Sequence, residues 1–173
     1  MTFSLVNQRS GFAEVPAQAL RLSGGASLIA VGTVASPAVA LTDPAHKTAG
    51  LVEAPQDWDA PEDVTVLVVL ALAALQLDAD TLDLDFEYTF TVPGGGGGGD
   101  LGKTSTTITP RLTVTTAGGL VAESLYMLSF MLDRADVNNG YAGATAGCFS
   151  FRINPNAASV VTDVSVLSIG LVF

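Results

Sequence analysis

The stretch LDLDFEYTFTV, residues 82–92, decides the fold class of this 173-residue chain. Its leucine, phenylalanine, tyrosine and valine residues occupy every second position, and Asp, Glu or Thr stands between them. Because successive side chains of a β-strand point to opposite faces of a sheet, this alternation predicts a strand with one apolar and one polar face. It is the clearest strand in the sequence.

Segments on both sides of this strand are also rich in β-branched and aromatic residues, and Gly, Pro, Asn and Asp separate them. The expected strands are 28–34, 64–77, 104–109, 111–116, 121–132, 148–153 and 160–173. The segment 64–77 is ambiguous, because its first half is β-branched and its second half, LALAALQL, contains good helix formers. We favour a buried strand there. Pro110 cannot donate to a ladder, so it indicates a sheet edge or a bulge.

About eight strands and the lack of an amphipathic helix predict an all-β fold, an antiparallel β-sandwich of the jelly-roll type. Residues 36–63, rich in Pro, Ala and Asp, are expected to form a long loop with at most a short strand near residues 50–53. Residues 1–25 are expected to form an N-terminal arm or an edge strand, and residues 26–173 the sandwich domain.

Charge and hydropathy narrow the classes of function. Seven Lys and Arg against 17 Asp and Glu give a net charge of -10, which opposes binding to nucleic acid. Hydrophobic residues make up 49% of the chain and the mean hydropathy is +0.47, so contacts with other subunits are expected. The longest apolar run, residues 64–75, is shorter than the roughly 20 residues of a membrane span. The N-terminus does not resemble a secretory signal, so synthesis in the cytoplasm is expected.

The segment GGGDLGKT, residues 97–104, matches the phosphate-binding pattern G-x-x-x-x-G-K-[ST]. In nucleotide-binding proteins the residues equivalent to Lys103 and Thr104 begin a helix whose amides hold the phosphates. The residues that follow here, STTITPRLTVTT, favour a strand, and the glycines 94–99 suggest a hairpin tip. We therefore expect neither a nucleotide nor any other cofactor.

Three acidic residues, Asp83, Asp85 and Glu87, lie on one face of the expected strand and are the candidate metal ligands. Carboxylate oxygens suit calcium, although the spacing does not match an EF-hand loop. The alternative is a solvated polar face that discourages edge-to-edge aggregation. Cys148 is the only cysteine, which excludes a thiolate zinc site within this chain.

No group of residues indicates catalysis, so the chain is not expected to be an enzyme. His46, the only histidine, lies in the loop DPAHKTAG, and no nucleophile motif such as G-x-S-x-G accompanies it. Cys148 precedes FSF in an expected strand and is interpreted as a buried structural thiol.

Three aromatic residues are candidates for interaction. Trp58 and Tyr141 lie in polar loops, where an aromatic side chain can stack on a sugar or anchor an interface. The alternative for both is packing over the protein's own core. Phe173 ends an apolar segment that is expected to be buried in its own sheet or against another subunit.

Within the last third of the chain, residues 126–153 read YMLSFMLDRADVNNGYAGATAGCFSFRI: a strand ending in an Asp/Arg pair, a loop with Asp, Asn, Gly and Tyr, and an alternating aromatic strand. This segment resembles the jelly-roll or sandwich domains in small structural proteins of tailed bacteriophages. The resemblance implies a capsid decoration (cement), head-fibre or tail-associated protein, commonly trimeric.

The main hypothesis is therefore a virion structural protein, a decoration or fibre-base subunit. It would associate with itself, with a trimer favoured, and with the major capsid protein or other virion subunits, and it would reside in the virion. The alternative is a carbohydrate-binding jelly-roll module of a phage tail or adhesin that uses Trp58 and Tyr141.

Overall fold

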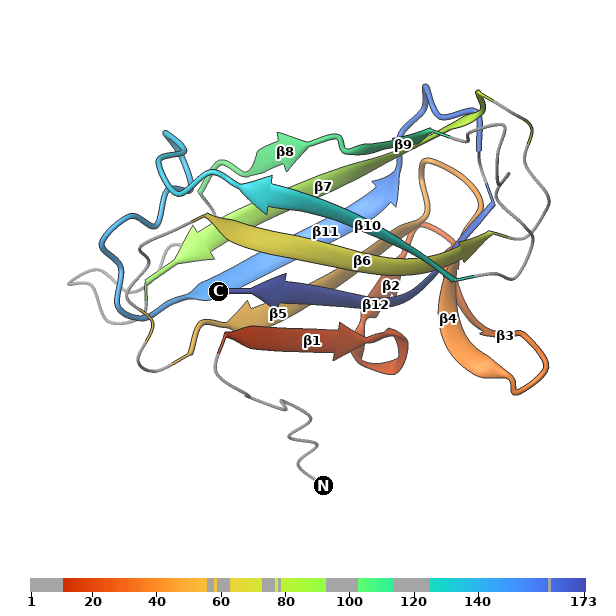
Figure 1. The fold of residues 1–173 in the computed structure, drawn as a ribbon, viewed down its shortest axis with the longest axis horizontal. Helices are drawn as coiled ribbons and strands as arrows, with labels where there is room; N and C mark the ends of the chain where they lie inside the picture. Colours follow the sequence, from red (N-terminus) through yellow and green to blue (C-terminus); the bar gives the residue numbers. More distant parts are fainter. Residues whose placement is uncertain are drawn as a thin grey trace.

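The computed structural model of the chain describes residues 11–55, 58, 63–72, 77, 79–92, 103–113, 125–161 and 163–173. These residues form two six-stranded sheets, here called sheet A and sheet B, which lie face to face (Figure 1). A three-residue 3-10 helix, Ala17–Ala19, is the only helix in the described part of the chain. No helix there is long and apolar enough to cross a membrane.

All strand pairs in both sheets are antiparallel. Sheet A contains β1 (Phe12–Pro16), β3 (Ser27–Val31), β4 (Ser36–Leu41), β6 (Val64–Leu72), β10 (Leu125–Leu132) and β12 (Val164–Val172). Sheet B contains β2 (Arg21–Ser23), β5 (Lys47–Glu53), β7 (Thr81–Thr91), β8 (Thr106–Ile108), β9 (Arg111–Thr113) and β11 (Cys148–Pro155). The order in sheet A is β10-β6-β12-β4-β3 with β1 on β12, and in sheet B β2-β5-β11-β7-β8 with β9 on β7.

Eight strands pair in a nested series that alternates between the sheets: β4 with β12, β5 with β11, β6 with β10, and β7 with β8. This series is the wrapped hairpin of a jelly roll, so the predicted all-β antiparallel sandwich of that type is confirmed. The strands β1, β2, β3 and β9 extend the two sheets, which brings the total to twelve among the described residues.

The predicted long loop over residues 36–63 is wrong, because β4 and β5 lie within it. The side chains of Ala38, Val39 and Leu41 are fully buried, so β4 is a core strand despite its small residues. Pro37 is tolerated because it lies outside Val39–Leu41, the part of β4 that pairs with β12. Composition indicated a loop, whereas burial between two neighbouring strands decided the structure.

Other strand predictions are confirmed. The ambiguous segment forms strand β6 over Val64–Leu72, where Val64, Val66 and Val68 are fully buried and β10 and β12 pair on either side. Residues 73–76 lie outside the described residues. Pro110 separates β8 from β9, which both pair with β7 at the edge of sheet B, as its missing N–H predicted.

Candidate functional site

The aromatic candidates pack inside the sandwich. Trp58 is 7% exposed, and its ring lies 5.3–6.0 Å, centroid to centroid, from four other rings. These rings are Phe90, Tyr141, Phe149 and Phe173. The alternative that packs the loop tryptophan over its own core is therefore the one observed. Stacking on a sugar needs an open ring face, which Trp58 does not present.

Tyr141 is 1% exposed and closes the same end of the sandwich. Its hydroxyl accepts a hydrogen bond from the Val64 N–H (2.6 Å) and donates one to the Leu132 carbonyl (2.5 Å). Burial raises the pKa of Tyr141 to about 12, so the hydroxyl keeps its proton at neutral pH. Tyr141 thus joins the start of β6 to the end of β10, a structural role.

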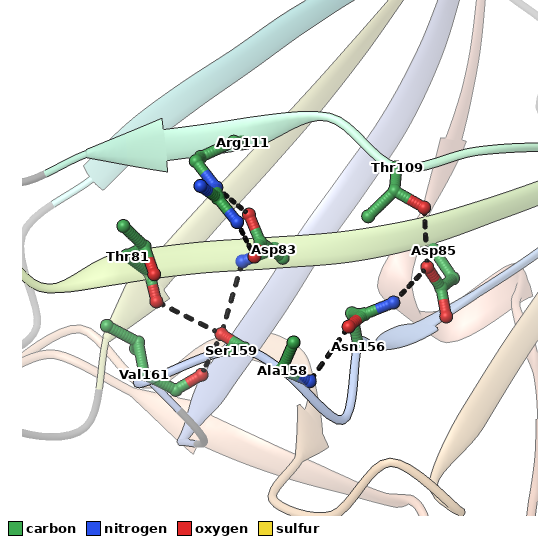
Figure 2. Close-up of polar contacts among 9 residues, drawn as sticks. All are labelled: Thr81, Asp83, Asp85, Thr109, Arg111, Asn156, Ala158, Ser159 and Val161. Carbon is green, nitrogen blue, oxygen red and sulfur yellow. Dashed lines mark hydrogen bonds and ion pairs between the residues drawn. The ribbon is translucent and has the colours of Figure 1, made fainter.

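Asp83 does not point into solvent as a polar strand face would predict, because Arg111 of β9 covers it (Figure 2). The Arg111 Nε and Nη2 atoms donate to the two carboxylate oxygens, both at 2.7 Å. The hydrogen bond from Arg111, with its charge, lowers the pKa of Asp83 against the opposing effect of burial. This bidentate pair ties β9 to β7.

Asp85 and Glu87 also have protein partners. The Thr109 hydroxyl and the Asn156 amide each donate to Asp85 Oδ1 at 2.8 Å (Figure 2). The Ser105 hydroxyl donates to Glu87 Oε1 at 2.5 Å, and Arg152 Nη2 pairs with Glu87 Oε2. The hydrogen bond from Ser105, followed by that from Arg152, lowers the pKa of Glu87. Asp83, Asp85 and Glu87 therefore each have hydrogen-bond donors of their own.

The calcium candidates are consequently not assembled as a metal site. Among the residues that the structure describes, no three His, Cys, Asp or Glu side chains converge in a way that could hold a metal ion. The carboxylates of β7 instead bind side chains of β9 and β11, of the residues on either side of β8, and of the residue that follows β11. Sequence alternation placed them on one face correctly, but could not show which neighbours lie beside them.

The residues of the phosphate-binding pattern that are described do not begin a helix. Lys103 lies in a bend, and strand β8 begins at Thr106. The Lys103 Nζ atom is 3.5 Å from the Asn138 carbonyl oxygen. A phosphate-binding loop needs the amides of a helix directly after the lysine. Here a strand follows, as the threonine-rich sequence predicted, and it does not supply them.

His46 and Cys148 lie at opposite ends of β5, since His46 precedes Lys47 and Cys148 is opposite Glu53. His46 follows a turn between β4 and β5, where its Nδ1 accepts a hydrogen bond from the Thr42 N–H at 3.2 Å. Cys148 begins β11 and is only partly buried, so its interpretation as a buried structural thiol is corrected. Burial, with the nearby charge of Glu53, raises the pKa of the Cys148 thiol, which disfavours the reactive thiolate.

The outer side of sheet A carries an apolar surface that the sequence patterns did not single out. Leu125, Met127 and Met131 of β10 are 66%, 63% and 64% exposed. Register places residues of β6 and β12 on the same side, since Met127 lies opposite Val69 and Met131 opposite Thr65, which in turn lies opposite Val172. We call this the apolar face; it consists of Phe12, Leu67, Val69, Leu125, Met127, Met131 and Val172.

A glycine shapes the middle of the apolar face. Gly170 of β12 lies opposite Leu67 of β6, and a Cβ atom added to it would be 2.6 Å from the ring of Phe12. The Phe12 ring thus lies over the glycine backbone and extends the apolar face from β10 to β1. A usable signal was present in the sequence: LYMLSFML is apolar at nearly every position, which is typical of a strand buried on both sides.

The outer side of sheet B has the opposite chemistry. A shallow hollow of about 190 Å³ is lined there by Glu87, Tyr88, Thr89, Ser105, Ser150, Phe151 and Arg152. The Arg152 Nε atom is buried and has no hydrogen-bond partner within the described part of the chain. We call this the polar face. None of the described aromatic side chains is exposed on it or elsewhere.

No family model and no curated protein sequence matches the chain. Among solved structures, the C-terminal family 22 carbohydrate-binding module of Clostridium thermocellum Xyn10B is 15% identical with a TM-score of 0.46, covering 89% of this chain and 86% of that one. The CBM22-1 xylan-binding domain of Paenibacillus barcinonensis Xyn10C is 12% identical with a TM-score of 0.41, covering 91% and 86%. Tailspike protein 4 of bacteriophage CBA120 is 11% identical with a TM-score of 0.34, covering 93% and 19%.

Carbohydrate-binding modules thus predominate over phage and virus chains among the similar structures. Their identities and TM-scores are too low to transfer a ligand or an activity to this chain. The choice between the two hypotheses therefore depends on the surfaces of the chain itself.

Proposed function

We propose that this chain is a non-catalytic structural subunit of a virion, which binds other protein subunits through the apolar face. One observation carries the proposal: Leu125, Met127 and Met131 are each more than 60% exposed, on the same side of sheet A as Leu67, Val69 and Val172. Soluble monomers rarely expose such surfaces, because apolar area in contact with water lowers stability and promotes association. None of the eight residues of β10 is charged, so the residues that give the chain its net charge of -10 lie elsewhere.

We propose a bacteriophage particle because residues 126–153 resemble structural proteins of tailed bacteriophages. In this proposal the chain decorates a capsid or forms the base of a fibre, associates with itself and binds the major capsid protein or a neighbouring virion subunit. It needs no cofactor, and its place is the assembled particle. The partner's matching surface is expected to be apolar, since burial of uncharged surface is what the apolar face offers.

The test is co-expression of the chain with the genes that flank its own, followed by sedimentation of the particles that form. We expect the chain in the particle fraction, and we expect Leu67→Lys to remove it, because a lysine on the apolar face cannot be buried without losing hydration. Leu51→Lys is the matched control, since Leu51 is an exposed mid-strand leucine of β5 on the outer side of sheet B. Thermal melting checks that both variants fold. A chain absent from the particle fraction contradicts the proposal.

The second candidate function is carbohydrate binding at the polar face. It is favoured by the hollow on the polar face, whose lining includes Glu87, Ser150 and Arg152, side chains of the kind that hydrogen-bond to sugar hydroxyl groups. The lack of an exposed aromatic ring among the described residues removes the usual stacking platform.

A glycan array separates the two functions. Binding that is lost in Arg152→Gln and retained in Leu67→Lys would support the polar face as a sugar site. Absence of binding to all glycans would remove this candidate and leave the structural proposal unaffected.

A further inference from the structure

A second hollow adjoins the hollow of the polar face. It has a volume of about 600 Å³, within the size range of ligand sites, and its lining includes Arg21 of β2, Ala49 and Leu51 of β5, and Ser150 of β11. Ser150 and Phe151 line both hollows, so the two meet at β11. Together they form a groove, here called the sheet B groove, that crosses the outer side of sheet B from β2 to β7.

Basic side chains flank the middle of this groove. Register places Arg21 opposite Ala49 and Ala49 opposite Arg152, so the two arginines lie on one face of the sheet, about 10 Å apart from Cα to Cα. Lys47 lies on the same face, two residues before Ala49 on β5. Three of the seven basic residues therefore gather here, in a chain whose net charge is -10.

The described acidic side chains leave part of this positive charge without a partner. Arg152 forms an ion pair with Glu87. The Ser105 hydrogen bond lowers the pKa of this carboxyl most, and the charge of Lys47 lowers it further. Arg21 forms no ion pair with any residue that the structure describes. Its guanidinium, at one end of the groove, is therefore available to an anionic group of a ligand.

The rest of the groove offers hydrogen bonds and apolar contacts. The Ser150 hydroxyl both donates and accepts, and the Glu87 carboxylate accepts, as sugar hydroxyl groups require. Ala49 and Leu51 supply apolar surface for the C–H groups of a sugar ring. A long polyanion such as nucleic acid needs many of its charges neutralised, which three cations on a chain of net charge -10 do not provide. The combination favours a polyhydroxylated ligand with isolated carboxylates.

We propose that the sheet B groove binds an oligosaccharide that contains an acidic sugar, a uronic acid, and that Arg21 binds its carboxylate. A guanidinium holds a carboxylate with two parallel hydrogen bonds, which adds geometric selectivity to the attraction of the charges. Ser150 and Glu87 bind hydroxyl groups of the neighbouring sugar units. The inference rests on the candidate carbohydrate binding at the polar face, and adds to it the class of sugar and the residue that selects it.

This site is compatible with attachment to a particle. The two sheets lie face to face, so their outer sides point in opposite directions (Figure 1). A subunit that attaches through the apolar face of sheet A leaves the outer side of sheet B open to solvent. One chain can therefore contact the particle and a saccharide at the same time.

The experiment measures binding of the full chain to oligosaccharides in matched pairs, which differ only in whether one sugar carries a carboxylate or a hydroxymethyl group. Glucuronic acid with glucose, and galacturonic acid with galactose, are such pairs. We expect the acidic member to bind about tenfold more tightly than the neutral one, and Arg21→Gln to remove this difference. Arg134→Gln is the matched control, because Arg134 lies in the loop after β10 and lines neither hollow.

Ala49→Leu tests the place of the site without a change of charge. The larger side chain fills the space between Arg21 and Arg152, so we expect the acidic and the neutral member to lose affinity by a similar factor. Ala49 points to the outer side of sheet B, so the substitution leaves the core intact. Thermal melting checks that all three variants fold.

Each result decides between the proposals. Equal binding of both members by the wild-type chain overturns the acidic selectivity and leaves carbohydrate binding standing. An acidic preference that survives Arg21→Gln, or that Arg134→Gln removes as well, overturns the role of Arg21. Binding that Ala49→Leu does not weaken overturns the groove as its place. Absence of binding to every member overturns both this inference and the carbohydrate candidate, while sedimentation alone decides the virion proposal.

Discussion

At the scale of single residues, Tyr141 shows how a loop is fixed onto the sandwich. Its ring packs in the aromatic cluster with Trp58. Its hydroxyl hydrogen-bonds to one backbone donor and one backbone acceptor that would otherwise be buried without a partner. Asn139 acts similarly in the same loop: its Oδ1 accepts from the Phe90 N–H and its Nδ2 donates to the Thr104 carbonyl. These polar groups hydrogen-bond to the protein's own backbone and hold the loop on the sandwich.

Tyr141→Phe therefore tests the structural role. The substitution keeps the ring but leaves the Val64 N–H and the Leu132 carbonyl without their partner, which is expected to lower the free energy of unfolding by about 1–3 kcal/mol. Urea denaturation measures the change. Val137→Ala, at a 93% exposed position of the same loop, is the control and is expected to stay within about 0.5 kcal/mol of wild type. A Tyr141→Phe variant as stable as the control would show that water replaces the hydroxyl.

At the scale of elements, strand β7 has two different faces. The inward face of Leu82, Leu84 and Phe86 is fully buried in the core. The outward carboxylates bind side chains of β9, β11 and the neighbouring segments, so β7 is held by polar contacts on one side and apolar packing on the other (Figure 2). On the outward face, which was expected to be solvated, Asp83 is buried, whereas Asp85 and Glu87 are partly exposed.

The enclosed carboxylates predict acid sensitivity. The pKa values of Asp83 and Glu87 are lowered in the folded state from ordinary values of 3.8 and 4.5. Their contribution to stability is complete above these ordinary values and is lost as the pH falls through the lowered folded ones. We expect the free energy of unfolding to be flat near pH 6 and to decrease below about pH 4.5, with a smaller decrease in Asp83→Asn. Urea midpoints across pH measure this; an unchanged slope in the variant would contradict it.

At the scale of the whole molecule, charge and apolar surface are separated. The chain carries a net charge of -10, while the residues of the apolar face are uncharged and the exposed Glu14 of β1, opposite Gly170, borders them. Two copies that associate through the apolar face therefore repel each other through the rest of their surfaces, and the burial of Met127 and Met131 must outweigh this repulsion.

Salt is accordingly expected to strengthen self-association. Raising the ionic strength from about 0.02 M to about 0.5 M shortens the screening length severalfold and removes most of the repulsion between the two chains. Analytical ultracentrifugation should show the dissociation constant falling severalfold over this range. A rising dissociation constant would indicate that ion pairs hold the interface, which is incompatible with association through the apolar face.

The sequence by itself determined the fold class, because an alternation such as that of residues 82–92 depends only on the two-residue period of a strand. It favoured a strand over residues 64–77 without excluding a helix and limited Pro110 to a sheet edge or a bulge, and the structure decided both. The division of residues 1–25 from the sandwich stays a prediction, since residues 1–10 lie outside those described, although β1 and β2 each pair within a sheet.

Only the tertiary structure decided which surfaces are open. Trp58 and Tyr141 look like ligand-binding residues in a polar loop, and Asp83 looks solvated, until distant strands are seen to cover them. Conversely, Met127 and Met131 look like core residues until the structure shows that they point to the outer side of sheet A, whereas Leu128 and Leu132 of the same strand point inward. Exposure depends on contacts between residues far apart in the chain, and periodicity, which describes near neighbours, contains no information about them.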